Sequence, residues 1–372
     1  MAEFNEHDGR GGRERGRGGR DMRRPNRDEQ REERRREAAR HTGLMKAAFG
    51  RETDEAIENA RIYEEGEGRA LLWGAEAAAA ARVVKAAAEM AEADAEGAQA
   101  GNEEACEAAE IAEEAAEAAE EAADPDGAAG AAPTATETTV KVVTSFAPEA
   151  LYRDATGKTM IVDPGAFTRP GGAYEDGAFG PEQILCSESN LYPILVAHKR
   201  DFYDKNRDYR RGSLFTDRAL YVPEVLFSRG GDVRRADVLV IAEPVRAFAL
   251  ENHRSERECD KALADRIEAI FRIAAANGTE TLIVGAFGCG RNGYPVEQVI
   301  ELIQNWIAEH PGAVPNVVFA VPRMHADAFR EAFGAPEPER PAPVVVAEDE
   351  GDREGDDEGW RNVELPEGIT LR

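Results

Sequence analysis

The sequence predicts an α/β domain in which a mixed, mostly parallel sheet lies between helical layers. The first observation is that short runs rich in β-branched residues alternate with helical segments between residues 136 and 335. The second is that two of these runs lead into glycine-rich turns, each followed by a helix. Because the carboxyl ends of parallel strands meet at one edge of a sheet, both turns are expected to face one ligand.

Strands are predicted where apolar, β-branched runs are short and bounded by turn residues. They comprise residues 140–144, 159–162, 219–227, 236–242, 281–284 and 317–321. Longer periodic segments predict helices at 184–196, with one break at Pro193, and at 255–277, 296–309 and 325–333. Ser255 is a suitable N-cap for the second of these helices, and Gly278 is a suitable stop.

The rest of the chain divides by composition. Residues 1–27 are predicted to form a disordered Arg/Gly-rich tail, 28–67 a helical preface, 68–135 an Ala/Glu-rich helical insertion and linker, and 336–372 an acidic disordered tail. Arginine–glycine tracts can bind RNA, but this one shares its segment with acids and has no interleaved aromatic residue for base stacking. We interpret it as a solvated tail in preference to an RNA-binding arm.

Charge and composition narrow the function further. The net charge of −27 disfavours a general affinity for nucleic acid or anionic membranes. No run approaches the roughly 20 apolar residues that span a bilayer, so we expect no membrane association and a cytoplasmic location. The cysteines and histidines are widely scattered, and we expect neither a metal site nor a cofactor. The basic segment 198–211 is interpreted as a solvated helix and loop in preference to a path for a polyanionic polymer.

The two glycine-rich turns, at residues 169–183 and 285–295, form the candidate ligand site. Glycine allows positive φ and close approach to a ligand, and free N–H groups at the start of a helix face an anion. One such turn is weak evidence, but two at one edge of a sheet suit a diphosphate. Tyr174, Phe179 and Phe287 either flank a sugar or base or belong to the core.

Several short motifs follow one another in the order and spacing of a known family. They are Pro170-Gly-Gly172, Glu182, Leu185-Cys186, Leu191-Tyr-Pro193, Phe215-Thr-Asp217 with Tyr221-Val-Pro223, and Gly285-Ala-Phe-Gly-Cys-Gly290. Over residues 136–335, the chain resembles the microbial-type poly(ADP-ribose) glycohydrolases, a branch of the macrodomains. The resemblance implies a macrodomain-like three-layer fold and binding of ADP-ribose or ADP-ribosylated proteins. The low-complexity stretch then resembles an insertion between preface and core.

The resemblance also implies roles for individual residues. Both loops would wrap the diphosphate, and the carboxylates after the first loop would face the distal ribose. The implied ligand-binding residues are Asp163, Gly171, Gly172, Ala173, Tyr174, Gly177, Gly285, Phe287, Gly288, Cys289, Gly290 and Asn292. In the family, the last Glu of a Gln-Glu-Glu motif drives cleavage, because a glycosidic bond breaks faster when an acid protonates the leaving oxygen.

The sequence departs from the family pattern at this motif. Gln183 occupies the position of the decisive Glu, Pro181 that of the Gln, and Ala173 that of the third glycine. Asp163 stands where the family usually has Asn, and Asn292 where an aromatic residue is expected. An amide can bind a ribose hydroxyl but cannot exchange a proton near neutral pH. Ala173 leaves the approach to phosphate open provided that its φ is negative.

Three functions follow from these observations. The favoured one is a module that binds ADP-ribose and has lost all or most hydrolysis. The second is an active ADP-ribosyl glycohydrolase in which Glu182 serves as the acid. The third is a non-enzymatic scaffold whose charged tails recruit partners and whose pocket is vestigial.

Overall fold

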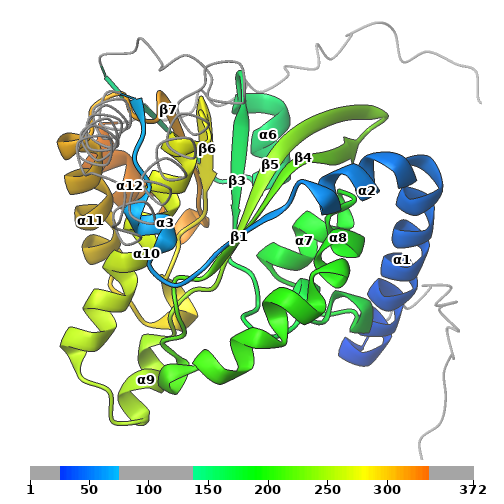
Figure 1. Cartoon of the computed structure of the whole chain (residues 1–372), viewed down its shortest axis with the longest axis horizontal. Coiled ribbons are helices and arrows are strands. Elements are labelled where there is room, and N and C mark those ends of the chain that lie inside the picture. The colour runs from blue at the N-terminus through cyan, green and yellow to red at the C-terminus, as the bar shows by residue number, and fades with distance from the viewer. Residues whose placement is uncertain (1–25, 75–136, 335–372) are drawn as a thin grey trace, which may run out of the picture. The chain divides into compact units, whose positions relative to one another are not determined.

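The computed structural model describes residues 26–74 and 137–334. The predicted Arg/Gly-rich tail, most of the Ala/Glu-rich insertion and the acidic tail lie outside the described residues. Within the described ranges, helices cover both faces of one seven-stranded sheet (Figure 1). The predicted α/β sandwich class is therefore confirmed.

The sheet has the spatial order β1-β4-β5-β3-β6-β7-β2. Its strands are β1 (Arg61–Tyr63), β2 (Thr139–Val143), β3 (Thr159–Asp163), β4 (Ala219–Arg229), β5 (Asp232–Ile241), β6 (Thr281–Val284) and β7 (Asn316–Ala320). The five strands from β5 to β2 run parallel, whereas β4 is antiparallel to both β5 and β1. All six predicted strands are present, with ends shifted by a few residues.

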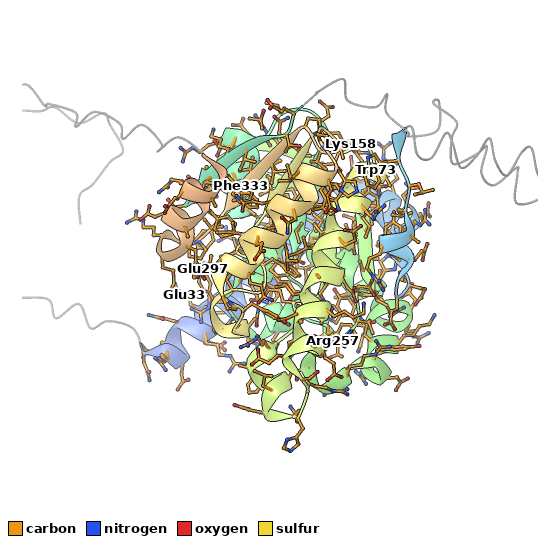
Figure 2. The ribbon with its side chains drawn as sticks, turned by 90° about the vertical axis from the view of Figure 1, so that its left-hand side faces the viewer. Glu33, Trp73, Lys158, Arg257, Glu297 and Phe333 are labelled. Atoms are coloured by element: carbon orange, nitrogen blue, oxygen red, sulfur yellow. The ribbon has the colours of Figure 1, made fainter. Side chains whose placement is uncertain are left out.

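Helices form a layer on each face. The described helices are α1 (Arg27–Ala48), α2 (Gly50–Glu58), α3 (Glu67–Ala70), α6 (Ala147–Asp154), α7 (Pro181–Ser187), α8 (Leu191–Ala197), α9 (Arg246–Glu251), α10 (Glu256–Ala276), α11 (Val296–Glu309) and α12 (Arg323–Phe333). One layer contains α3, α9, α10, α11 and α12, with α10 and α11 in contact (Figure 2). The other contains α6, α7 and α8; α1 and α2 pack against α8, and α2 also contacts β4 (Figure 1).

The alternation of strand side chains explains why the runs are apolar throughout. Met160 and Val162 point into the core beneath α10 and α11, whereas Ile161 between them points into the core beneath α7 and α8. Successive residues of a strand face opposite sides, so a central strand covered on both sides needs a continuous apolar run. By the same alternation, Asp163 at the end of β3 is on the same side of the sheet as Ile161.

Two sequence expectations about helices have opposite outcomes. The Ser255 cap is confirmed, since its hydroxyl accepts the Glu258 N–H at 3.2 Å and the Glu258 carboxylate accepts the Ser255 N–H at 2.8 Å. The break at Pro193 is wrong. The chain leaves helical geometry between α7 and α8, and Pro193 lies in the first turn of α8, where a missing N–H costs no hydrogen bond.

The preface also differs from the all-helical expectation. Residues 61–63 form β1, which pairs with β4 and closes that edge of the sheet. The buried Tyr63 side chain belongs to the core beneath α10. A three-residue strand carries no periodic signal of its own, because its partner strand fixes it.

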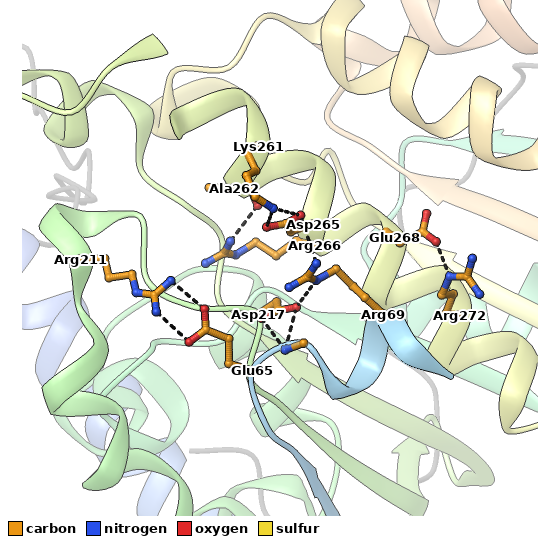
Figure 3. A network of polar contacts seen from close by, with 11 residues as sticks. Glu65, Arg69, Arg211, Asp217, Lys261, Ala262, Asp265, Arg266, Glu268 and Arg272 are labelled. Atoms are coloured by element: carbon orange, nitrogen blue, oxygen red, sulfur yellow. Dashed lines mark hydrogen bonds and ion pairs between the residues drawn. The ribbon is translucent and has the colours of Figure 1, made fainter. Parts of the chain in front are cut away.

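Ion pairs hold the chain after β1 against the core (Figure 3). Asp217 is buried and accepts hydrogen bonds from the Gly66 N–H at 3.1 Å and from Arg69 Nε at 2.6 Å. Glu65 pairs with Arg211 in the same network. Beside it, the buried Arg218 donates two hydrogen bonds to the Glu64 carboxylate. The preface is therefore joined to the core by both backbone pairing and charge.

Trp73 extends this attachment along the layer that contains α10 and α11 (Figure 2). Its ring lies 5.8 Å from that of Trp306 and 5.4 Å from that of His310. The Arg272 guanidinium lies over the Trp73 ring at 5.1 Å. Residues 71–73 consequently pack against α10 and α11.

Candidate functional site

The candidate site lies where β5, β3 and β6 end side by side. Parallel pairing places the ends of these three strands at one edge of the sheet. The first glycine-rich loop follows β3, the second follows β6, and Glu243 lies two residues beyond β5. In open α/β sheets this edge is the usual position of a ligand.

The first loop contains three consecutive residues in left-handed geometry. The φ values are 64° at Gly171, 52° at Gly172 and 70° at Ala173. The condition set for Ala173, a negative φ, is therefore not met. A left-handed non-glycine residue costs roughly 1–2 kcal/mol, so surrounding contacts must hold this turn in place.

Gln183 supplies such contacts. Its Nε2 atom donates to the Gly171 carbonyl at 3.0 Å and to the Gly172 carbonyl at 3.2 Å. An ionised Glu at this position has no hydrogen to donate and would place its oxygens against two carbonyl oxygens. The amide therefore stabilises a loop conformation that an ionised carboxylate would oppose.

Glu182 lies beneath the same loop and is buried. Its Oε2 atom accepts the Ala166 N–H at 2.9 Å, while Oε1 has no hydrogen-bond partner among the described residues. Burial raises the pKa of this carboxyl well above its usual range, and the charge of Asp163 raises it further. Hydrogen bonds from the Ala166 and Gly171 N–H groups oppose the rise. The surroundings of Glu182 therefore favour its neutral form.

Asp163 completes a pair of buried acids. Its side chain is fully buried, and neither carboxyl oxygen has a hydrogen-bond partner within the described ranges. Burial and the charge of Glu243 raise its pKa to about 8. Protonated carboxyls can donate hydrogen bonds, so Asp163 and Glu182 have the chemistry to bind the hydroxyl groups of a sugar.

In the second loop, a carboxylate binds the backbone. The Gly288 N–H donates to Glu243 Oε1 at 2.7 Å, and the Asn292 side-chain amide donates to Oε2. Burial raises the pKa of Glu243 to about 7, and these two hydrogen bonds and Arg291 act in the opposite direction. Asn292 is therefore held against Glu243.

Several implied ligand-binding residues are largely buried in the protein. Tyr174 packs against Tyr192, and both Phe287 and Cys289 belong to the core beneath α10. At Gly177, an added Cβ would lie 2.0 Å from the Arg31 carbonyl oxygen of α1. Packing within the protein therefore explains the residue type at each of these positions, and no ligand contact is needed to explain it.

The glycines of the two loops differ in how closely other atoms approach them. An added Cβ at Gly172 would lie 2.4 Å from the side chains of Gln183 and Glu182, so Gly172 has no room for a side chain. One at Gly285 would meet only the Ala320 carbonyl, and Gly290 has open space around it. The second loop therefore has the less enclosed backbone, at Gly285 and Gly290.

Sequence reasoning missed two polar residues at this site. Glu243 directly follows the predicted strand 236–242, so its place at the carboxyl edge was available from the strand assignment. The Tyr203 hydroxyl is buried without a described partner, and burial and the charges of Glu182 and Asp163 raise its pKa. It lies in the basic segment 198–211, where nothing in the sequence indicated an inward-facing group.

A pocket of about 370 Å³ lies on the α1 side of the first loop. Its lining includes Arg34, His41, Phe179 and Gln183. The exposed Phe179 ring faces Arg34 at 5.8 Å. Gln183 therefore contacts both the loop backbone and this pocket.

Within the described residues, no group of three or more His, Cys, Asp or Glu side chains could hold a metal ion. None of the helices in residues 26–74 and 137–334 is long and apolar enough to cross a membrane.

The fold and the paired loops define a macrodomain-like α/β protein, and comparison with known proteins identifies its family. The model of the microbial-type PARG (poly(ADP-ribose) glycohydrolase) catalytic domain matches residues 43–230. The chain belongs to this family. The match begins within α1, so it includes much of the preface.

Solved structures support the fold. The Thermomonospora curvata poly(ADP-ribose) glycohydrolase has 20% sequence identity and a TM-score of 0.56, over 82% of this chain and 98% of that chain. Its complex with the inhibitor ADP-HPD has the same identity and coverage and a TM-score of 0.54. The Deinococcus radiodurans enzyme in complex with ADP-ribose has 18% identity and a TM-score of 0.53, over 76% of this chain and 97% of that chain. No match was found among curated proteins.

Proposed function

We propose that this chain recognises ADP-ribose or ADP-ribosylated proteins, with glycohydrolase activity lost or much reduced. The observation that carries the proposal is the pair of hydrogen bonds from Gln183 Nε2 to the first-loop carbonyls. The side chain at the expected catalytic position stabilises the loop and cannot transfer a proton near pH 7. Recognition requires the loops, and their glycines are present.

The proposed ligand position follows from the two loops and the buried acids. The diphosphate lies against the backbone of both loops, at Gly172 and at the less enclosed Gly290, and the distal ribose hydroxyls meet Asp163 and Glu182. One relative has been solved with the inhibitor ADP-HPD and another with ADP-ribose. The chemistry of the loops and acids supports the same ligand class here.

Titration calorimetry with ADP-ribose tests recognition. We expect binding by the wild type and weaker binding by Gly172→Ala, whose Cβ would lie 2.4 Å from the side chains of Gln183 and Glu182. Gly230→Ala is the matched control. Gly230 also has positive φ, but it lies in the turn that joins β4 to β5, where an added Cβ would contact nothing. Absence of heat from the wild type at millimolar ADP-ribose would rule out the proposal.

A second candidate, hydrolysis with Glu182 as the acid, is favoured by the raised pKa and unpartnered Oε1 of that residue. Incubation with poly(ADP-ribose) and measurement of released ADP-ribose distinguishes the two. We expect no release from the wild type. Release that disappears in Glu182→Gln would establish this second function in place of the first. Release created by Gln183→Glu would support the assignment of position 183.

A further inference from the structure

We propose that Glu243 is a specificity-determining residue of the second loop, because its carboxylate occupies the Gly288 N–H that a ligand phosphate would otherwise use. A diphosphate then binds at Gly288 only by displacing this carboxylate. The inference rests on the proposed function, since it concerns how the same site receives ADP-ribose.

The position of Glu243 follows from the strand order. Glu243 follows β5, the second loop follows β6, and β3 lies between those two strands. Neighbouring strands lie about 4.8 Å apart, so β5 and β6, with β3 between them, are roughly 10 Å apart. A contact between the residues that follow these two strands has to bridge that separation. The 2.7 Å hydrogen bond to Gly288 therefore crosses the end of β3. Asp163 lies at that same end of β3.

The contacts of Glu243 make it a competitor for anions. Carboxylate and phosphate oxygens accept the same backbone hydrogen, and charge-assisted hydrogen bonds of this kind are the stronger ones. A carboxylate left beside a bound phosphate would also repel it. As a residue Glu243 is partly exposed, although its carboxyl group is desolvated.

Asn292 fixes the second oxygen of this carboxylate. It stands where the resemblance to the family led us to expect an aromatic residue. The amide donates to Glu243, whereas an aromatic ring would leave that oxygen without this donor. Asn292 therefore holds the Glu243 carboxylate in place, and this hydrogen bond gives the unexpected residue at position 292 a structural role.

The electrostatic surroundings define the conditions for a test. The negative charge of Glu243 raises the pKa of both Asp163 and Cys289, whereas Arg291 lowers the pKa of Glu243. All variants should therefore be compared at one fixed pH near 7.5, because a change of pH would alter the protonation of several of these groups at once. Glu297 is the control carboxylate: it is exposed in the first turn of α11, near the second loop (Figure 2).

The experiment is titration of full-length wild type, Glu243→Gln, Asn292→Ala and Glu297→Gln with ADP-ribose and with adenosine. We expect Glu243→Gln to bind ADP-ribose about tenfold more tightly than the wild type, a change of about 1.4 kcal/mol. Asn292→Ala should change affinity in the same direction by a smaller factor. Glu297→Gln should remain within about twofold, and adenosine, which has no phosphate, should show no gain.

Several results would overturn the inference. Equal or weaker binding of ADP-ribose by Glu243→Gln would do so, as would an equal gain for adenosine or for Glu297→Gln. In these cases wild-type binding of ADP-ribose leaves the proposed function intact. If none of the four proteins binds ADP-ribose, the proposed function fails as well. Thermal melting of each variant identifies any loss of binding that is caused by unfolding.

Discussion

Replacing Gln183 by Glu changes one nitrogen into oxygen, yet we expect it to destabilise the fold. The substitution removes two hydrogen bonds, of 3.0 and 3.2 Å, to the carbonyls of Gly171 and Gly172. Each such bond contributes about 1 kcal/mol net, and carbonyls facing a carboxylate add a further penalty at this half-buried position. The expected loss is about 3 kcal/mol at pH 8, or roughly 6–12 °C in melting temperature for a domain of this size.

The loss should depend on pH. Two facing carbonyls disfavour the ionised form, so the pKa of the new carboxyl is higher in the folded than in the unfolded state. The contribution of this carboxyl to the free energy of unfolding is then greatest at low pH and is lost as pH rises through the folded-state pKa. A protonated carboxyl can donate one of the two lost bonds. The deficit relative to wild type should therefore be smaller at pH 5 than at pH 8.

Urea denaturation of wild type, Gln183→Glu and Gln183→Met at both pH values measures these effects. The Met variant lacks the donors and carries no charge, so its deficit should not vary with pH. Gln304→Glu is a calibrating control, because Gln304 Nε2 donates to a single carbonyl, that of Ala332. A Gln183→Glu protein as stable as wild type at pH 8, or relatively less stable at pH 5, would refute the reasoning.

Three further substitutions test other contacts. Asp163→Asn should flatten the pH dependence of stability: the wild-type pKa of about 8 exceeds the unfolded value, so its contribution is complete below pH 4 and is lost as pH rises towards 8. By urea denaturation, the variant should be the more stable protein at pH 8.5, by on the order of 3 kcal/mol, and a difference independent of pH would contradict the assignment. Asp217→Ala should cost about 2–3 kcal/mol in the same assay, because it removes the 2.6 Å pair with Arg69 and the acceptor of the Gly66 N–H. Asp265→Ala, which removes a 3.5 Å pair with Arg69 and a solvent-exposed pair with Lys261, should cost under about 1 kcal/mol. Trp73→Ala should cost about 2 kcal/mol in thermal melts, and an unchanged melt would show that residues 71–73 add nothing to the domain.

The sequence predicted the central sheet well because its strands are buried on both faces. The run at 159–162 is apolar at every position, and the structure divides its side chains between two cores. The edge strand β1 was missed because its three residues are defined by pairing with β4. Pro193 was misread because a proline in a first turn and a proline that breaks a helix look alike until the helix start is known.

The site was predicted in position more than in detail. Glycine spacing indicates the two loops, but it does not show which carboxylates contact their backbones. The positive φ at Ala173 and the hydrogen bonds of Gln183 depend on each other, and neither can be derived from residue type alone. Glu243 was missed because its partner, the Gly288 N–H, is a backbone group about forty-five positions later in the chain.

The attachment of the preface has a consequence for how the protein is made. Glu64 and its partner Arg218 are 154 residues apart, and the β1–β4 pairing lies beside them. At synthesis rates of about 5–20 residues per second, the first segment leaves the ribosome roughly 10–30 s before its partner strand. The earliest part of the domain to be synthesised therefore cannot take its final place until much later. During that interval Tyr63 has no core to enter, so its ring stays unburied until the later strands are made.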